Sequence, residues 1–407
     1  MNPFDYLKKY GLKRACQVIW EYKLPRIQVA ILARLTRNRP LDNTLIIESH
    51  NDFDCNGGAL YDWLIENGYN QNIKIVWRLY HAEPDNLPRN VSCVPVYGPS
   101  WKKAWAICTA KWMTADCSVA DKIRDDQISV YMTHAAFSLK ETKGLVEVPP
   151  SVDYVLGLTA EMDDYFIEEC GIDSSMTKLL HIGYPDLDRL INKQHSKNYT
   201  FSEIFNKKTI LWMPTFRKGV VFGRDDSSDS YPYGIPLVDS EERLDDLNRL
   251  LNEYDLNLII KLHPKQDVSS IESGRLNNVF VLTGSSIKTN SFDNYDLMLN
   301  SIALISDYSG AAYQFLTLDR PMAFVLSDLD KYKVGLIEHS EDYMPGHKVM
   351  SYGDLCDFII DIAEEADRFS LERKQLIEKL YGDCAAGSCE RLIKFLGINS
   401  NNELNNR

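Results

Sequence analysis

From residue 44 onward, the sequence alternates short apolar runs rich in β-branched residues with segments of helical periodicity. The apolar runs have the length and composition of buried β-strands. They cover residues 44–48, 73–79, 129–133, 154–158, 178–182, 209–213, 256–262, 279–282, 302–306 and 322–326. The helical segments include residues 58–67, 161–170, 241–253 and 308–318. Strands that alternate with helices form parallel sheets covered on both faces, so the pattern predicts an α/β fold.

The length of the chain predicts more than one domain. At 407 residues it exceeds the roughly 250–300 residues that a single hydrophobic core usually serves. A polar stretch without clear periodicity, residues 193–208, interrupts the alternating pattern near its middle. We therefore expect two α/β domains that face a cleft, at residues 40–200 and 201–398, followed by a polar tail at 399–407.

Residues 1–39 form a separate segment that is basic and of helical periodicity. They hold nine Lys and Arg residues against two acidic residues, a balance of +7, whereas the whole chain has a net charge of −13. Apolar residues recur near helical spacing before and after a break at Pro25, with cations between them. One interpretation is a pair of amphipathic helices on an anionic membrane surface, and this one we favour. The alternative is a helical hairpin packed on the first domain with its basic face in water.

Composition excludes several classes of protein. The net charge of −13 argues against a general nucleic-acid binder, which needs a basic surface. The nine cysteines are an odd number without a CxxC pair, so they indicate neither a disulfide framework nor a zinc site. No apolar stretch approaches the roughly 20 residues of a membrane-spanning helix, and no secretion signal is recognisable. No cluster of carboxylates has the spacing of a metal site.

Residues suited to phosphate chemistry follow four of the predicted strands, where open α/β sheets bind their ligands. These stretches are THAAFSLK at 133–140, PTFRKG at 214–219, HPK at 263–265 and DYSGAA at 307–312. A helix that opens on Ser309 and Gly310 would offer free backbone N–H groups to an anion. Each stretch alone also fits a structural histidine, a helix cap or a solvated turn. Because three of the four lie in the second half, we expect a diphosphate to bind there, with His134 facing it from the first half.

Taken in order, these motifs resemble the CDP-glycerol glycerophosphotransferase family, the teichoic acid primases and polymerases and their capsule relatives. The family pattern HGTPLK aligns with residues 134–140, GYPRND with 183–188, PTWR with 214–217, RxH with 261–263 and DYSS with 307–310. Later patterns align with Arg320-Pro321, with Asp328 or Asp330 and Tyr332, with 345–347, and with 383–391. The similarity runs over roughly residues 44–396. Ala-Ala-Phe replaces the Gly-Thr-Pro of the first pattern, and Gly310 replaces a serine.

The resemblance implies a GT-B-like fold of two Rossmann-like domains and a transferase. Such an enzyme moves an alditol phosphate from a CDP-activated donor to a hydroxyl of a cell-envelope polymer or lipid-linked acceptor, releasing CMP. We expect the alditol phosphate to be glycerol phosphate, with ribitol phosphate as the other possibility. It would work in the cytoplasm, peripheral to the inner face of the cell membrane. Mg²⁺ could accompany the donor diphosphate, with no metal held by the protein itself.

The resemblance also assigns site residues. His134 and His263 are implied as catalytic. The residues implied in substrate binding are Lys140, Thr215, Arg217, Lys261, Asp307, Ser309, Gly310 and Ser388. We expect His134 to act as general base because an imidazole titrates near neutral pH. His50 also follows a predicted strand, and a place on the acceptor side or in a surface loop fits it equally well.

Two other functions share the expected architecture. An ordinary GT-B glycosyltransferase would use a nucleotide sugar in the same kind of cleft. A non-catalytic nucleotide-binding subunit of an envelope-polymer complex would bind the CDP-alditol without turnover. The nucleotide that is released distinguishes all three.

Overall fold

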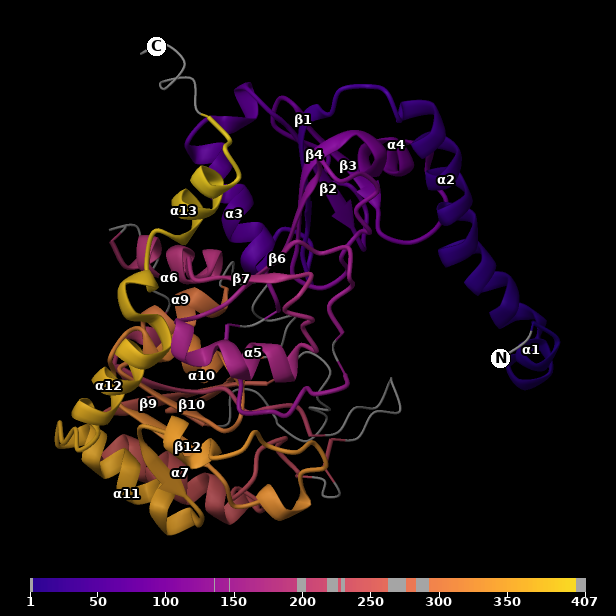
Figure 1. The fold of residues 1–407 in the computed structure, drawn as a ribbon. Helices are drawn as coiled ribbons and strands as arrows, with labels where there is room; N and C mark the ends of the chain where they lie inside the picture. Colours follow the sequence, from indigo (N-terminus) through magenta and orange to yellow (C-terminus); the bar gives the residue numbers. More distant parts are fainter. Residues whose placement is uncertain are drawn as a thin grey trace. The chain divides into compact units, whose positions relative to one another are not determined.

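The structure is a computed structural model, and it describes residues 3–134, 136–145, 147–195, 203–217, 226–227, 231–262, 276–282 and 293–399. The chain divides into two compact units (Figure 1). Unit 1 consists of residues 1–134, 143–188 and 384–407, and unit 2 of residues 135–142 and 189–383.

Unit 1 is built on a parallel sheet with the strand order β3-β2-β1-β4-β5-β6-β7. The strands are β1 (Asp42–Glu48), β2 (Lys74–Leu79), β3 (Val91–Pro95), β4 (Ala110–Ala115), β5 (Ile128–Tyr131), β6 (Tyr154–Leu156) and β7 (Lys178–Leu180). The last five residues of β1 are all buried, as expected of a central strand covered on both faces. The strand order reverses between β1 and β4, which places the topological switch point there.

Unit 2 contains a second parallel sheet, in the order β10-β9-β8-β11-β12-β13. Its strands are β8 (Lys208–Trp212), β9 (Leu256–Lys261), β10 (Val279–Leu282), β11 (Ala303–Ser306), β12 (Met322–Val325) and β13 (His347–Val349). A continuous hydrophobic core joins these strands to the helices on the sheet, with fully buried residues such as Leu258, Leu247 and Phe358. The switch point of this sheet lies between β8 and β11. Together the two sheets confirm the predicted fold class of two Rossmann-like domains.

The helices connect the strands in both units. In unit 1 they are α1 (Pro3–Val18), α2 (Leu24–Thr36), α3 (Cys55–Glu66), α4 (Trp101–Thr109), α5 (Asp163–Glu169) and α13 (Ser388–Phe395). In unit 2 they are α7 (Glu241–Glu253), α9 (Asn294–Leu299), α10 (Gly310–Leu316), α11 (Tyr352–Ala363) and α12 (Ser370–Tyr381). Helix α6 (Pro185–His195) begins in unit 1 and continues into unit 2. Short 3-10 turns are η2 (Tyr69–Gln71), η3 (Ala160–Met162), η4 (Glu203–Phe205), η5 (Leu329–Lys331), η6 (Ser340–Tyr343) and η7 (Gly382–Cys384).

The basic N-terminal segment is helical, as predicted, but Pro25 does not break it. A π-helical turn, η1 (Ile19–Lys23), leads directly into α2, where Pro25 occupies the first turn and needs no N–H partner. The interruption lies instead at Gly11, whose φ of 78° is left-handed. Helix α2 packs beside α4, and Leu32 joins a small buried cluster with Ala104 and Cys108.

The units differ from the predicted domains in three places, and the first is the main boundary, which lies between residues 188 and 189 and not between 200 and 201. Residues 135–142 follow His134 directly in sequence but belong to unit 2, and residues 384–407 return to unit 1. The return is fixed by α13, because the carboxylate of Asp188 accepts hydrogen bonds from the amides of Ser388 and Cys389 at 2.9 and 2.7 Å. A boundary prediction based on local polarity does not detect such a crossing.

Candidate active site

The switch point of unit 2 brings together two of the predicted motifs. The turn after β8 carries Thr215, and the turn after β11 carries Asp307. The Thr215 amide donates to Asp307 Oδ2 at 2.8 Å, and the Thr215 hydroxyl donates to Asp307 Oδ1. Both residues are buried. The side chain of Asp307 therefore fixes the backbone of the 214–217 turn against the 307–310 turn.

Arg217, which the resemblance implies in substrate binding, occupies the centre of this cluster. Its Nε and Nη2 donate to the two carboxylate oxygens of Asp328 at 2.8 and 3.1 Å, and Nη1 donates to Asp307 at 2.8 Å. Nη1 also donates to the Thr215 carbonyl at 2.8 Å, and Nη2 to the Tyr308 hydroxyl at 3.3 Å. A guanidinium has five N–H groups, and these contacts engage all five. The side chain is 1% exposed, so Arg217 supports the two turns from below their surface.

Aromatic residues complete the support around Arg217. Its guanidinium lies 5.1 Å from the ring centre of Tyr308 and 5.4 Å from that of Tyr332. The hydroxyls of Tyr308 and Tyr231 both donate to Asp328, at 3.2 and 3.1 Å. Burial alone would raise the pKa of Asp328, but hydrogen bonds and the charge of Arg217 outweigh it and the pKa is lowered. Asp328 therefore remains ionised and keeps the cluster assembled at neutral pH.

Ser309 and Gly310 lie at the surface of this switch point. Ser309 is the N-cap of α10, and its side chain accepts a hydrogen bond from the Ala311 amide at 3.4 Å. Both residues are half-buried, so the start of the helix is accessible. Lys261 is the last residue of β9 and is also half-buried. His263 and the stretch at 218–225 lie outside the described residues.

Lys140 lies in unit 2 and not in the first domain where it was predicted. It forms an antiparallel bridge with Leu336, and the Ile337 amide donates to the Leu139 carbonyl at 2.9 Å. The Ser138 hydroxyl donates to the Tyr308 carbonyl at 3.3 Å. We call residues 137–141 the strap: Ser138 attaches it to the turn after β11, and Leu139 and Lys140 attach it to residues 336–337.

Phe137 anchors the strap. It is 1% exposed, and its ring lies 4.6 Å from that of Tyr313 and 5.0 Å from that of Tyr343. This aromatic anchor stands where the family pattern has Gly-Thr-Pro, and the sequence analysis assigned it no function.

Ser388 belongs to unit 1, which corrects its assignment to the donor-binding domain. It is the first residue of α13, is fully buried, and its amide is held by Asp188. A side chain at Gly183, whose φ is 78°, would collide with the Ser388 hydroxyl and the Cys384 carbonyl. Gly183 and Ser388 therefore form a close packing contact between the start of α6 and the start of α13.

In unit 1, the residues after β1 and β5 bring two histidines together. The rings of His50 and His134 have centroids 4.1 Å apart and planes inclined by 43°. Both residues are exposed. Thr133, just before His134, has a left-handed φ of 57°, and its carbonyl accepts a hydrogen bond from Asn56 Nδ2 at 3.1 Å. The turn that presents His134 is therefore held by the first turn of α3.

Two buried carboxylates lie beneath these histidines, and the sequence analysis missed both. Glu48 ends β1 and accepts hydrogen bonds from the Tyr80 hydroxyl at 2.5 Å and the Ser118 amide at 2.9 Å. Asp116 follows β4 and accepts from the His50 amide at 2.5 Å and the Gly57 amide at 3.3 Å. Burial and the nearby Glu48 raise the pKa of Asp116 to about 8. Strand β4 was not predicted from the sequence. Asp116 directly follows this strand, so its place at a strand end could not be predicted either.

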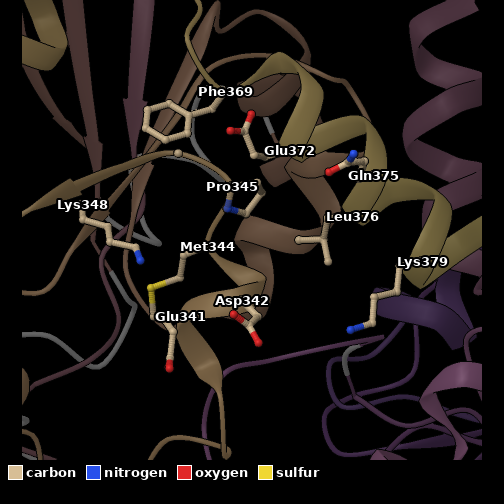
Figure 2. Close-up of a pocket in the computed structure, with 11 residues that line it drawn as sticks. Glu341, Asp342, Met344, Pro345, Lys348, Phe369, Glu372, Gln375, Leu376 and Lys379 are labelled. Carbon is tan, nitrogen blue, oxygen red and sulfur yellow. The ribbon is translucent and has the colours of Figure 1, made fainter.

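A cavity of about 580 Å³ lies elsewhere in unit 2 (Figure 2). Its lining comes from the segment 341–348 and from α12, and includes Met344, Lys348, Phe369, Glu372 and Lys379. The backbone at Gly346 approaches the Met322 carbonyl, which places this cavity at the amino-terminal edge of β12 and β13. It contains none of the predicted site residues. Among the described residues, no group of three or more His, Cys, Asp or Glu side chains is arranged to hold a metal ion.

The sequence is similar to known proteins over most of its length. The family model for CDP-glycerol:poly(glycerophosphate) glycerophosphotransferase matches residues 31–396. A teichoic acid glycerol-phosphate primase of Bacillus subtilis is 31% identical over 210 residues, which are 51% of this chain and 48% of that protein. The chain therefore matches about half the length of this relative. A teichoic acid glycerol-phosphate transferase of Staphylococcus aureus is 28% identical over 395 residues, 89% of this chain and 95% of that one.

The fold also has a solved counterpart. The wall teichoic acid polymerase TagF superposes with a TM-score of 0.69 over 98% of both chains at 18% sequence identity. At that identity the likeness concerns the fold alone. The match of the family model covers both switch points, both motif turns of unit 2, and the return of α13 to unit 1. The chain belongs to the CDP-glycerol:poly(glycerophosphate) glycerophosphotransferase family.

Proposed function

We propose that the protein transfers an alditol phosphate from a CDP-activated donor to a hydroxyl of a cell-envelope polymer or a lipid-linked acceptor, with release of CMP. The observation that carries this proposal is the family match over residues 31–396. The buried Thr215–Asp307 pairing supports it, because it fixes the two turns of unit 2 where an α/β sheet binds a nucleotide.

In the proposed reaction, the acceptor oxygen attacks the phosphorus that carries the alditol. A P–O bond to the alditol phosphate forms, and the bond to CMP breaks. The proton of the acceptor hydroxyl passes to the imidazole of His134. The transition state spreads negative charge over the phosphoryl oxygens, so positioning and electrostatic stabilisation provide most of the catalysis.

We assign the phosphate contacts to groups at the surface of the unit 2 switch point. These are the backbone amides near Ser309 and Gly310 and the Lys261 ammonium. From the family motif we add His263, which lies outside the described residues. Arg217, Thr215 and Asp307 hold these turns in place instead of contacting the diphosphate, since the guanidinium is enclosed by protein groups. Lys140 is brought to the same turn by the strap. A Mg²⁺ ion, if one takes part, would enter bound to the donor diphosphate.

An assay of nucleotide release tests this function. The protein is offered CDP-glycerol, CDP-ribitol and a panel of nucleotide sugars, each with a saccharide or lipid-linked acceptor. We expect CMP from a CDP-alditol, and the faster of the two reactions identifies the alditol. Release of UDP or GDP from a sugar nucleotide, with no CMP, would identify a glycosyltransferase. Binding of CDP-glycerol without turnover on any acceptor would identify a non-catalytic subunit.

We also propose that the protein acts in the cytoplasm, with α1 and α2 attached to the anionic inner surface of the cell membrane. Helix α2 buries Leu32 and Thr36 but exposes Ile27, Ile31 and Leu35, to 54%, 45% and 75%. These three lie four residues apart, so they share one face of the helix. Within the described residues, no helix has both the length and the apolar composition to cross a bilayer. An apolar stripe flanked by exposed cations is typical of a helix that lies in the interface.

A further inference from the structure

The switch point of unit 1 lies between β1 and β4, where an open parallel sheet usually places a ligand. His50 is an exposed residue of the loop after β1. The proposed function uses His134, after β5, and gives His50 no role.

The backbones of both histidines are fixed by one support. The buried carboxylate of Asp116 accepts from the His50 amide at 2.5 Å and, through its other oxygen, from the Gly57 amide at 3.3 Å. The neighbouring Asn56 donates its side-chain amide to the Thr133 carbonyl at 3.1 Å. The first turn of α3 thus ties the loop after β1 to the turn before His134. This arrangement brings the rings of His50 and His134 together, with their centroids 4.1 Å apart.

We propose that His50 is a positioning residue for His134: its imidazole packs against that of His134 and keeps it oriented, and neutral, as a general base requires. This inference rests on the proposed function, which makes His134 the base. His50 itself needs no contact with the acceptor or the phosphate.

The charges around His50 and His134 explain why a second imidazole would affect the protonation of His134. Acidic groups lie in the elements around these strand ends: Glu48 ends β1, Asp52 and Asp54 lie in the following loop, Asp116 after β4 accepts the His50 amide, and Asp186 of α6 donates its amide to Asn56. Other titratable groups nearby are Cys55, Arg78, Tyr80, His81 and Cys117. Carboxylates favour the protonated imidazolium, which cannot accept a proton. A second imidazole in contact opposes this, because two positive charges at that distance repel each other.

The sign of the effect follows. With His50 present, protonation of either ring raises the cost of protonating the other, so His134 stays neutral to a lower pH. An uncharged ring in place of His50 removes this repulsion but leaves the carboxylates. The acidic limb of the pH profile for kcat/KM, which reports the base of the free enzyme, should then move to higher pH.

The test compares His50→Phe, His50→Ala and His181→Phe with the wild type, using CMP release from CDP-glycerol between pH 5 and 9. We expect the acidic limb to move up by about one unit in both His50 variants. His50→Ala should also lose about 10- to 100-fold in kcat, since it no longer supports the ring of His134. His181→Phe is the matched control, because His181 is exposed and its ring nitrogen binds Asp163 at 2.6 Å, and neither residue is among the charged groups around the pair. It should keep the wild-type profile.

The outcomes separate this inference from the function beneath it. If the wild type releases no CMP, or if His134→Ala is as active as the wild type, the proposed function with His134 as its base is wrong. If His134→Ala is inactive but His50→Phe keeps the wild-type acidic limb, or moves it down, only the role of His50 is wrong. A lower kcat in His50→Ala with a lower melting temperature and an unmoved limb would show a purely structural residue and would also overturn the inference.

Discussion

Arg217 and Asp328 form a bidentate ion pair inside unit 2, with Nε–Oδ2 and Nη2–Oδ1 distances of 2.8 and 3.1 Å. Breaking a buried pair by removing one partner leaves an uncompensated charge and typically costs about 3–5 kcal/mol. We expect Arg217→Ala to lower the free energy of unfolding by about this amount, as measured by urea denaturation. Arg217→Lys should recover little of the loss, because an ammonium cannot form the planar fork.

The control for this prediction is Arg249→Ala. Arg249 pairs with Asp246 on the surface of α7 and is 77% exposed, so its loss should change stability by less than about 1 kcal/mol. If Arg217→Ala unfolds like the wild type but no longer binds CDP-glycerol, the arginine contacts phosphate directly and our assignment of a supporting role is wrong.

The strap should depend on Phe137. Its ring is buried against Tyr313 and Tyr343, and truncation of a buried Phe to Ala typically costs about 3–5 kcal/mol. We expect Phe137→Ala to lower both the melting temperature and the rate of CMP release, because Ser138 would no longer be held at the Tyr308 carbonyl. Leu371→Ala is the comparison, at a residue that is 66% exposed in the same unit. Equal melting temperatures for the two variants would contradict this anchoring role.

Membrane attachment should depend on the exposed stripe of α2. The triple variant Ile27→Ser, Ile31→Ser, Leu35→Ser removes the stripe and keeps every cation of the helix. We expect it to sediment less with anionic vesicles at low salt than the wild type, while turnover of a soluble acceptor is retained. Added salt should also release the wild type, since each cation near the surface contributes about 1 kcal/mol that salt screens. Wild type and variant that both fail to sediment would show that the helix serves only to pack on α4.

The two histidines that we propose as catalytic should differ in what they affect. As a base that acts on the acceptor, His134 is needed for the chemical step, so His134→Ala should lower turnover by about 10²- to 10⁴-fold. Its dissociation constant for the CDP-alditol, measured by calorimetry, should stay near that of the wild type. His263→Ala should weaken nucleotide binding as well, because a hydrogen bond to a charged group is worth about 1.5–3 kcal/mol. Equal losses of affinity in the two variants would place both histidines at the nucleotide.

The sequence predicted the parallel sheets because short apolar runs, such as Leu45–Ile47 in β1 and Leu258–Ile260 in β9, alternate with helical segments, and such runs are typical of strands buried on both faces. It did not reveal β3, β4 or β13. Strand β13 is a three-residue edge strand with His347 and Lys348, and β4 follows α4 with no turn residue between them. Without β4, the position of Asp116 beneath His50 could not be predicted.

The candidate site was predictable to the level of motifs but not of roles. Thr215, Asp307 and Ser309 could be predicted because they come directly after predicted strands, where open α/β sheets bind their ligands. Two of the five hydrogen bonds of Arg217 go to Asp328, which lies 111 positions further along the chain, and no local pattern indicates that partner. The same is true of the pairing between His50 and His134.

The central claim is that the phosphorus travels with the alditol, and isotopic labelling tests it directly. CDP-glycerol labelled at the phosphorus that carries the glycerol is incubated with the protein and a saccharide or lipid-linked acceptor, and the products are separated. The account predicts that the label appears in the acceptor and that the released CMP is unlabelled. Label in released CDP, with only glycerol on the acceptor, would contradict it.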